Sequence, residues 1–219
     1  MRLQSAIFDM DGTLLDSMHI WREIGPRMLQ ARGITPAPDL GERLKPMTAR
    51  QGAAYCKEAY GLPETVDAVY AQIEDQVKRF YENEVEAKPG VKKLLSLLKM
   101  EGVWMYVATA TDRHLAEKAL QHAGIRDCFR GLVTSAETGA GKDVSPEIYE
   151  RAMRRLRSNK KDTVIFEDAL HAIRTAKTAG FRVAAIYDPS AEEDQEEIRA
   201  LADYYFRSFE ELFEAKSLE

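Results

Sequence analysis

Two aspartates near the start of the chain, Asp9 and Asp11, have the residue types and the spacing that best suit chemistry. They follow the apolar residues 6–8, which predict a short buried strand, and they precede Gly12, which permits a sharp turn. Two carboxylates this close at the end of a buried strand are costly to ionise without a counter-charge, and a divalent cation offers one. The arrangement therefore predicts a Mg²⁺ site in which one carboxylate can attack phosphorus.

The two carboxylates are suited to different roles. Asp9 is the candidate nucleophile, because a carboxylate that attacks phosphorus forms an acyl phosphate that water can cleave. Asp11 is the candidate general acid and base, which protonates the leaving oxygen and then activates the water. Its backbone carbonyl is also a candidate Mg²⁺ ligand, since this cation prefers oxygen donors. An Asp-rich turn after a strand is the simpler alternative, and it weakens as further site residues are found.

Two more residues are suited to hold a phosphoryl group. Thr109 follows the predicted strand 103–108 and can donate its hydroxyl, and free backbone N–H groups from Ala110 onward can add further donors. Lys142 lies in the glycine-rich segment 139–142, and its ammonium can neutralise both the nucleophile and the transferring phosphoryl group. Taken singly, each has a simpler explanation, as a strand-ending threonine and as a solvated loop lysine.

Glu167 and Asp168 follow another predicted strand, residues 163–166, and are candidate metal ligands. An acidic pair at a helix start can instead complement the helix dipole, but the buried strand before it favours a metal site. Ligands of open α/β sheets bind beyond the carboxyl ends of the strands. Because four separate segments supply suitable groups at or after strand ends, they predict one shared site.

The chain from residue 103 onward alternates short apolar runs with amphipathic stretches. Strands are predicted at residues 103–108, 131–134, 163–166, 182–187 and 202–206, and helices at residues 115–123, 146–156 and 169–179. Strands and helices that alternate at this spacing predict a parallel sheet covered by helices on both faces, a Rossmann-like α/β core.

The stretch between the first strand and this region has a different pattern. It shows no convincing strand, its apolar residues recur at helical spacing, and it is interrupted at residues 33–38, 45–46 and 61–63. We therefore expect three or four helices that form a small bundle. The predicted division is an α/β core domain of residues 1–15 and 88–219 with an inserted helical cap domain of residues 16–87.

Composition and charge exclude several classes of partner. The 219 residues are 45% hydrophobic and 31% charged with a formal net charge of −5, so nothing indicates a nucleic-acid or membrane surface. No apolar run reaches membrane-spanning length, and the N-terminus lacks the pattern of a signal peptide. Cys56 and Cys128 fit no metal or redox spacing and are expected to be reduced thiols. We expect a cytoplasmic protein, either a monomer or a homodimer.

The motifs together resemble those of the haloacid dehalogenase (HAD) superfamily over essentially the whole chain. Residues 9–13 are similar to its first motif, and Thr109 stands where the second motif has Ser or Thr. Lys142, with residues 146–149 after it, resembles the third motif, and residues 166–168 resemble the fourth. The nearest group is the β-phosphoglucomutase and phosphoglycolate phosphatase-like branch. The resemblance implies a HAD-like fold with a mobile helical cap.

Two departures from the superfamily pattern affect the site. Residues 143–145 separate Lys142 from Pro146, where many relatives place the proline directly after the lysine. In the fourth motif Ala172 stands where another aspartate is common, and the resemblance to the mutase-like branch implies that Glu167 supplies the second acid. The acid at Asp11 and the metal site argue against dehalogenation, which needs neither.

The inserted helices are expected to choose the substrate, because a lid over a charged site excludes water and contacts the leaving group. The basic segment 43–50 is the candidate to descend over the site. Within it, Arg43, Lys45 and Arg50 are candidate contacts for an anionic or sugar-like group. A solvated basic loop explains each of these residues equally well when it is taken singly.

The expected activity is that of a Mg²⁺-dependent phosphatase, a phosphoric monoester hydrolase that acts on a small phosphorylated metabolite through an aspartyl phosphate. The first alternative is a phosphosugar mutase similar to β-phosphoglucomutase, which would keep the same residues and return the phosphoryl group to its substrate. The second is a catalytically silent module phosphorylated on Asp9, like a receiver domain. Asp11 and the large insert argue against this second alternative.

Overall fold

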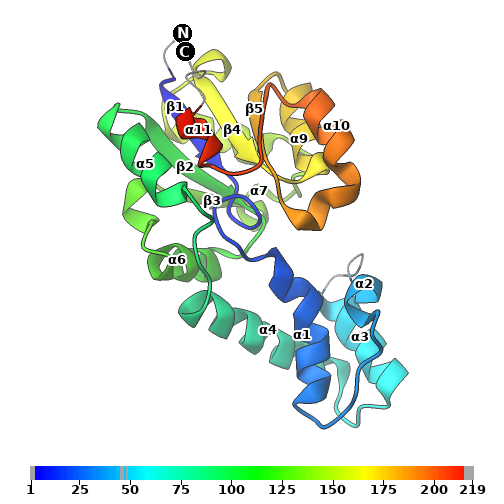
Figure 1. The fold of residues 1–219 in the computed structure, drawn as a ribbon. Helices are drawn as coiled ribbons and strands as arrows, with labels where there is room; N and C mark the ends of the chain where they lie inside the picture. Colours follow the sequence, from blue (N-terminus) through cyan, green and yellow to red (C-terminus); the bar gives the residue numbers. More distant parts are fainter. Residues whose placement is uncertain (1–2, 45–46, 48, 215–219) are drawn as a thin grey trace. The chain divides into compact units, whose positions relative to one another are not determined.

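The computed structural model describes residues 3–44, 47 and 49–214, and the chain divides into two compact units (Figure 1). The core unit comprises Met1–Asp16 and Val85–Glu219, and the helical unit comprises Ser17–Glu84. The helical unit is therefore an insertion after the first strand of the core. Each unit buries apolar side chains of its own.

Within the described residues, the core unit is built on a six-stranded parallel sheet with the order β3-β2-β1-β4-β5-β6. The strands are β1 (Ser5–Phe8), β2 (Trp104–Thr109), β3 (Leu132–Thr134), β4 (Thr163–Glu167), β5 (Arg182–Ile186) and β6 (Tyr204–Phe206). The predicted α/β class with a parallel sheet is thereby confirmed. The last strand is shorter than the predicted residues 202–206.

The first strand lies in the middle of the sheet, between β2 and β4. All residues of β1 and β4 are buried, as expected for strands covered on both faces. The register pairs Phe8 with Phe166, and their rings stack with centroids 4.4 Å apart. The N–H of Asp9 donates to the carbonyl of Phe166 at 2.9 Å. This register brings the residues that follow β1 and β4 together at one edge of the sheet.

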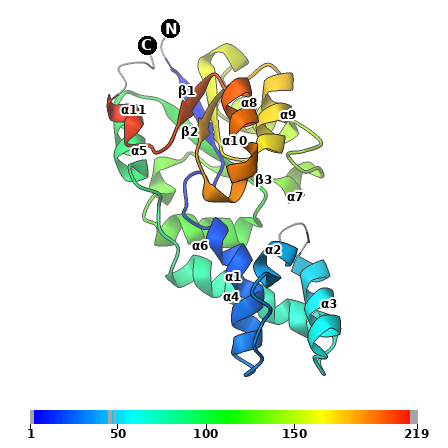
Figure 2. The same cartoon turned by 45° about the vertical axis from the view of Figure 1, so that its right-hand side comes forward.

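Helices cover both faces of this sheet (Figures 1 and 2). Those of the core unit are α5 (Val91–Met100), α6 (Arg113–His122), α7 (Ser135–Thr138), α8 (Glu147–Arg155), α9 (Leu170–Thr178), α10 (Gln195–Leu201) and α11 (Glu211–Glu214), with short 3₁₀ turns at η1 (Arg126–Cys128), η2 (Lys160–Asp162) and η3 (Pro189–Asp194). One face packs on α8, α9 and α10 through a cluster that includes Ile7, Ile165, Tyr149 and Ile173. Figure 2 shows α5 and α6 on the opposite side.

The helical unit has four helices in its described residues: α1 (Met18–Gln30), α2 (Leu40–Leu44), α3 (Ala49–Tyr60) and α4 (Val66–Asn83). Each long helix buries one apolar stripe, for example Ile20, Ile24 and Met28 in α1. Thr65 caps α4, because its hydroxyl accepts from the N–H of Ala68 at 3.2 Å.

In the described parts of both units, no helix combines the length and the apolar character that a membrane crossing requires.

Candidate active site

Three buried carboxylates meet at the edge of the sheet where β1 and β4 end. Asp9, Glu167 and Asp168 each offer one carboxylate oxygen, and these oxygens lie within 4.8 Å of one another. Each residue exposes 6% of its surface or less. The predicted nucleophile and the predicted metal ligands of the fourth motif are therefore neighbours, although more than 150 residues separate them along the chain.

Lys142 supplies a positive charge to this cluster. Its Nζ contacts Asp9 Oδ1 and donates to Glu167 Oε1 at 2.7 Å, and the whole side chain is buried. Burial by itself lowers the pKa of a lysine, but the charges of Asp9 and Glu167 outweigh it and hold the pKa of Lys142 above its ordinary value. The lysine therefore stays cationic beside the candidate nucleophile.

Glu167 already accepts four hydrogen bonds. Its Oε1 accepts from Lys142 at 2.7 Å and from the hydroxyl of Tyr149 at 3.0 Å. Its Oε2 accepts from the N–H groups of Asp168 at 2.9 Å and Ala169 at 3.1 Å. Burial opposes ionisation, but Lys142 and these donors lower the pKa of Glu167 below its ordinary value. The Glu167 carboxylate therefore holds the Lys142 side chain and the turn after β4 in place. It does so whether or not it also binds a metal.

Asp168 is held by the first motif. The hydroxyl of Thr13 donates to Asp168 Oδ1 at 2.6 Å, so the turn after β1 and the turn after β4 are joined directly. Burial, followed by the charges of Glu167 and Asp9, raises the pKa of Asp168 well above its ordinary value. Its second carboxylate oxygen is not committed to this hydrogen bond.

Fully ionised, the cluster would carry more negative charge than Lys142 offsets. Burial raises the pKa of Asp9 to about 8; Lys142 works against this rise, and Glu167 and Asp11 add to it. Lys142 pairs with two of the three carboxylates, Asp9 and Glu167. Oxygen donors that need a further positive charge are a suitable donor set for a hard divalent cation such as Mg²⁺. The residues thus fit the predicted metal.

Asp11 and Thr109 are linked through a residue that follows β2. The hydroxyl of Thr111 donates to Asp11 Oδ2 at 2.6 Å, and the N–H of Thr111 donates to the hydroxyl of Thr109 at 3.0 Å. Thr109 is buried and ends β2, while Ala110 lies exposed in the bend that follows. Since β2 pairs with β1, the predicted phosphoryl-binding residues lie beside the predicted acid.

The three candidate residues of the helical unit lie apart from this cluster in the sequence, and two of them, Arg43 and Arg50, contact neighbours within the helical unit. Arg43 lies in α2 and donates to Asp39 at 2.9 Å and to the hydroxyl of Tyr55 at 3.2 Å. Arg50 lies in α3 and pairs with Asp67. Both arginine side chains are more than half exposed. Lys45 falls outside the described residues.

Three residues at the site were not among the sequence candidates. Thr13, Thr111 and Tyr149 orient Asp168, Asp11 and Glu167, respectively. Thr13 and Tyr149 do lie within the segments that resemble the first and third motifs, which was the available signal. Thr111 follows Thr109 by two residues, and only the tertiary structure shows that its hydroxyl meets Asp11.

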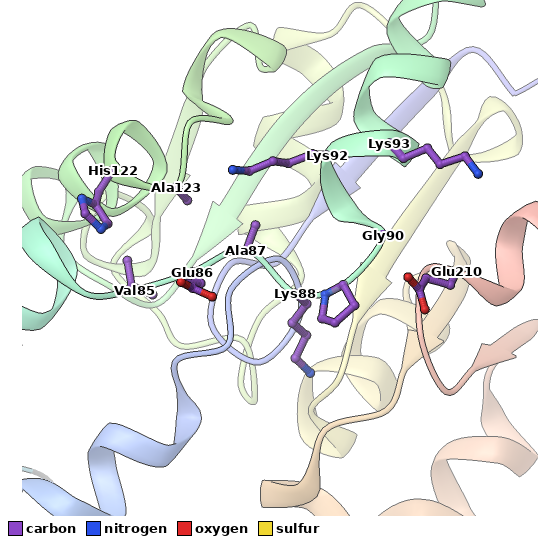
Figure 3. A pocket seen from close by; sticks show the side chains of 11 residues that line it. Val85, Glu86, Ala87, Lys88, Gly90, Lys92, Lys93, His122, Ala123 and Glu210 are labelled. Carbon is purple, nitrogen blue, oxygen red and sulfur yellow. The ribbon is translucent and has the colours of Figure 1, made fainter.

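A hollow of about 1020 Å³ lies elsewhere in the core unit, beside the return segment 85–90 (Figure 3). Lys92 and Lys93 line it, whereas Figure 3 shows the Lys88 side chain pointing away from both. The Nζ of Lys88 contacts Asp188 Oδ2 at 2.7 Å and the carbonyl of Tyr187 at 3.0 Å. This buried ion pair ties the return segment to the carboxyl end of β5 and offsets a charge that acts on Asp168.

The chain is similar to known proteins over most of its length. A family model described as haloacid dehalogenase-like hydrolase matches residues 3–180. A phosphorylated carbohydrates phosphatase from Thermotoga maritima is 27% identical over 178 residues, which cover 81% of this chain and 82% of the relative. Hexitol phosphatase B from Escherichia coli strain K12 is 26% identical over 217 residues, which cover 96% of this chain and 95% of the relative.

The fold has a close match among solved structures. A crystal structure from Thermotoga maritima, provisionally described as a beta-phosphoglucomutase, superposes with a TM-score of 0.88 at 24% identity. The match covers 99% of this chain and 100% of the other. At this identity the comparison shows a shared fold.

Proposed function

Because the chain belongs to the haloacid dehalogenase-like hydrolases, we propose that it is a Mg²⁺-dependent phosphatase that hydrolyses a small phosphorylated carbohydrate through an aspartyl phosphate. The observation that carries the proposal is the contact between the buried Lys142 ammonium and Asp9 Oδ1, inside a cluster of three carboxylates. A nucleophilic carboxylate and a fixed cation at the same strand end are what attack on an anionic phosphate ester needs.

The reaction has two half-reactions. First, a carboxylate oxygen of Asp9 attacks phosphorus, the ester P–O bond breaks, and Asp11 donates its proton to the leaving alkoxide. Second, Asp11 takes a proton from water, the water oxygen attacks the aspartyl phosphate, and inorganic phosphate and the Asp9 carboxylate are released. Thr111 orients Asp11 for both steps, since its hydroxyl is 2.6 Å from Asp11 Oδ2.

The remaining residues hold the phosphoryl group and the metal. Lys142, the Thr109 hydroxyl and the backbone N–H of Ala110 are the proposed phosphoryl contacts. Asp9, Asp168 and the backbone carbonyl of Asp11 are the proposed Mg²⁺ ligands, with Glu167 as a further acidic partner. When bound, Mg²⁺ supplies positive charge against the negative charge of the ester and the carboxylates.

The substrate class rests on the relatives. One of them is named a phosphorylated carbohydrates phosphatase and another a hexitol phosphatase, and the chain covers more than four fifths of each. We propose that the helical unit selects the substrate, with Arg43, Lys45 and Arg50 as its candidate contacts. Arg43 and Arg50 are exposed, and ion pairs this exposed are weak enough to be exchanged for contacts with a ligand.

A panel of sugar phosphates and sugar alcohol phosphates tests the proposal. Each compound is incubated with the protein and Mg²⁺, and released phosphate is measured with and without a chelator. We expect turnover of at least one compound, loss of turnover on chelation, and a decrease of about 10²–10⁴-fold when Asp11→Asn removes the acid and base. Turnover that is undiminished by both the chelator and Asp11→Asn would rule out the proposed chemistry.

The mutase alternative is kept because a protein described as a beta-phosphoglucomutase shares the whole fold. The same panel separates the two activities. A mutase converts a sugar 1-phosphate to its 6-phosphate, releases little phosphate and needs a bisphosphate activator. A phosphatase releases one phosphate for each substrate consumed, and a bisphosphate activator does not change its rate.

A further inference from the structure

A second hollow, of about 870 Å³, opens at the edge of the sheet opposite to the candidate active site. It lies where β1 and β2 begin, because Ser5 and Trp104, the first residues of these strands, line it. Asp9 and Thr109, by contrast, lie at the other ends of the same two strands. A ligand in this hollow would therefore bind apart from the catalytic groups.

Three arginines line this hollow together with one acidic residue, Glu101, and none of the three arginines pairs with a carboxylate of the described residues. Arg130, Arg155 and Arg157 form no ion pair with any acidic side chain in the described ranges 3–44, 47 and 49–214. Arg154, their neighbour on α8, does form one, with Glu147. Arg154 is thus paired with an acidic side chain of its own helix, whereas the three guanidinium groups at the hollow are available to an anion.

Two of the three arginines, Arg130 and Arg157, are close enough for one charge to act on the other. Partial loss of water, followed by the charge of Arg157, lowers the pKa of Arg130 from its ordinary value. Arg130 stays charged nonetheless, and its guanidinium stacks over the ring of Trp104, which remains 41% exposed. Like charges gathered around one hollow repel, and a bound anion removes that repulsion.

The backbone at Arg157 is also unusual. It has a φ of 53°, and among the described residues it is the non-glycine residue with positive φ. It follows the end of α8, a position where glycine is the usual residue because a side chain disfavours this conformation. The turn is closed by the N–H of Ser158, which donates to the carbonyl of Met153 at 3.2 Å. Arg157 therefore adds a positive charge to the lining of the hollow, although its backbone conformation is unfavourable for a residue with a side chain.

The basic surface continues beyond the hollow. Arg155 also lines a neighbouring hollow of about 340 Å³, together with Arg113 and Arg151. Those two arginines contact Glu137, through its carboxylate and its carbonyl. Arg155 therefore stands between two hollows, which suits an extended anion with several charges better than a single compact one.

We propose that Arg130, Arg155 and Arg157 form a binding site for a polyphosphate chain, either inorganic or the triphosphate of a nucleotide. Guanidinium groups bind phosphate oxygens through paired N–H donors, and three of them match an anion of several charges. Trp104 lines the same hollow and is 41% exposed, so the part of its indole that Arg130 leaves uncovered is available to the base of a nucleotide. This site is separate from the proposed phosphatase site and does not depend on it.

Calorimetric titration with sodium tripolyphosphate and with ATP tests the site, in the presence of a chelator so that no metal enters the active site. We expect saturable binding of tripolyphosphate that weakens as salt is added. Arg155→Gln weakens it by about 10-fold or more, as expected when a charged hydrogen-bonding partner is lost. Arg154→Gln is the matched control on the same helix and leaves the affinity unchanged.

Fluorescence locates the ligand independently of affinity. In a Trp21→Phe background Trp104 is the remaining tryptophan, and its emission changes on binding. Equal affinities for the two ligands show that the phosphate chain is sufficient, and a tighter ATP complex shows that the base adds stacking; both results support the site. Absence of saturable binding, or equal binding by wild type and by folded Arg155→Gln, overturns it.

Discussion

The two edges of the central sheet handle charge in opposite ways. At the carboxyl edge, Asp9, Glu167 and Lys142 are buried and contact one another across long stretches of sequence. At the amino edge, Arg155 and Arg157 are exposed and lack ion pairs with described carboxylates. Buried charges must find partners within the protein, whereas exposed charges are solvated by water. At the carboxyl edge, the contacts among the charged groups indicate their function. At the amino edge, the indication is that the arginines have no carboxylate partner among the described residues.

The largest effect is expected at the nucleophile. Asp9→Asn keeps the shape of the side chain but removes the carboxylate that attacks phosphorus, and we expect turnover to fall by about 10⁴-fold or more. Phosphate release from the best substrate of the panel is the measurement. Circular dichroism serves as the control for folding. A variant that retains a tenth of wild-type turnover would show that Asp9 is not the covalent nucleophile.

Removal of the buried cation should affect both activity and stability. Lys142→Met leaves Asp9 and Glu167 without their partner, and we expect a loss of about 3–5 kcal/mol in the free energy of unfolding. Turnover should fall by about 10²–10³-fold, because a charge that faces the transferring group is lost. Both are measured, by urea unfolding and by phosphate release.

The matched control for that variant is a lysine whose side chain is 36% exposed, in contrast to the buried Lys142. Lys160 pairs with Glu150 at 2.8 Å on the surface of the core unit, and Lys160→Met should cost less than about 1 kcal/mol. Equal destabilisation by Lys142→Met and Lys160→Met would contradict the difference between buried and exposed charge on which the comparison rests.

A third prediction concerns the buried Asp188 and the partly buried Lys88, which lie outside the carboxylate cluster. Burial opposes ionisation of Asp188, yet Lys88 and a hydrogen bond from Ser190 lower its pKa below the ordinary value. The ion pair therefore contributes stability above the pKa of an unfolded aspartate and loses it as the pH falls through the lower pKa of the folded state. Lys88→Met should cost about 3 kcal/mol at neutral pH.

Unfolding measured at a series of pH values checks this sign. From about pH 6 down to about pH 3, wild type should lose more stability than Lys88→Met, because the variant no longer has the pair to lose. Parallel curves for the two proteins over this range would mean that Lys88 does not set the protonation of Asp188.

The sheet could be predicted because its strands are short, apolar and bounded by polar residues. β1 and β4 are buried on both faces, so their apolar runs end where Asp9 and Glu167 begin. α5 was not among the predicted elements, although Val91, Leu94, Leu95 and Leu98 have the spacing of one buried helical face. The predicted core domain resumes at residue 88, but no helix or strand is predicted there before the strand at residues 103–108.

The site could be predicted by residue type but not by contact. Ligands of open α/β sheets bind beyond the carboxyl ends of the strands, and this rule predicted from the sequence alone that Asp9, Lys142 and Asp168 lie at one edge of the sheet. The four donors around Glu167 and the Thr13 hydroxyl on Asp168 depend on side-chain conformations that local sequence does not determine. A hydrogen-bond network across distant segments becomes visible only when tertiary packing places its members.

The smallest effect is expected at the amino edge. Arg155→Gln removes an exposed guanidinium that pairs with no described carboxylate, and glutamine is a good helix former, so stability should change by less than about 0.5 kcal/mol. Unfolding by urea in the absence of polyphosphate is the measurement. A loss above about 1 kcal/mol would mean that Arg155 stabilises the fold itself. The arginines at the amino edge would then resemble Asp9, Glu167 and Lys142 at the carboxyl edge, whose charges contact one another within the protein.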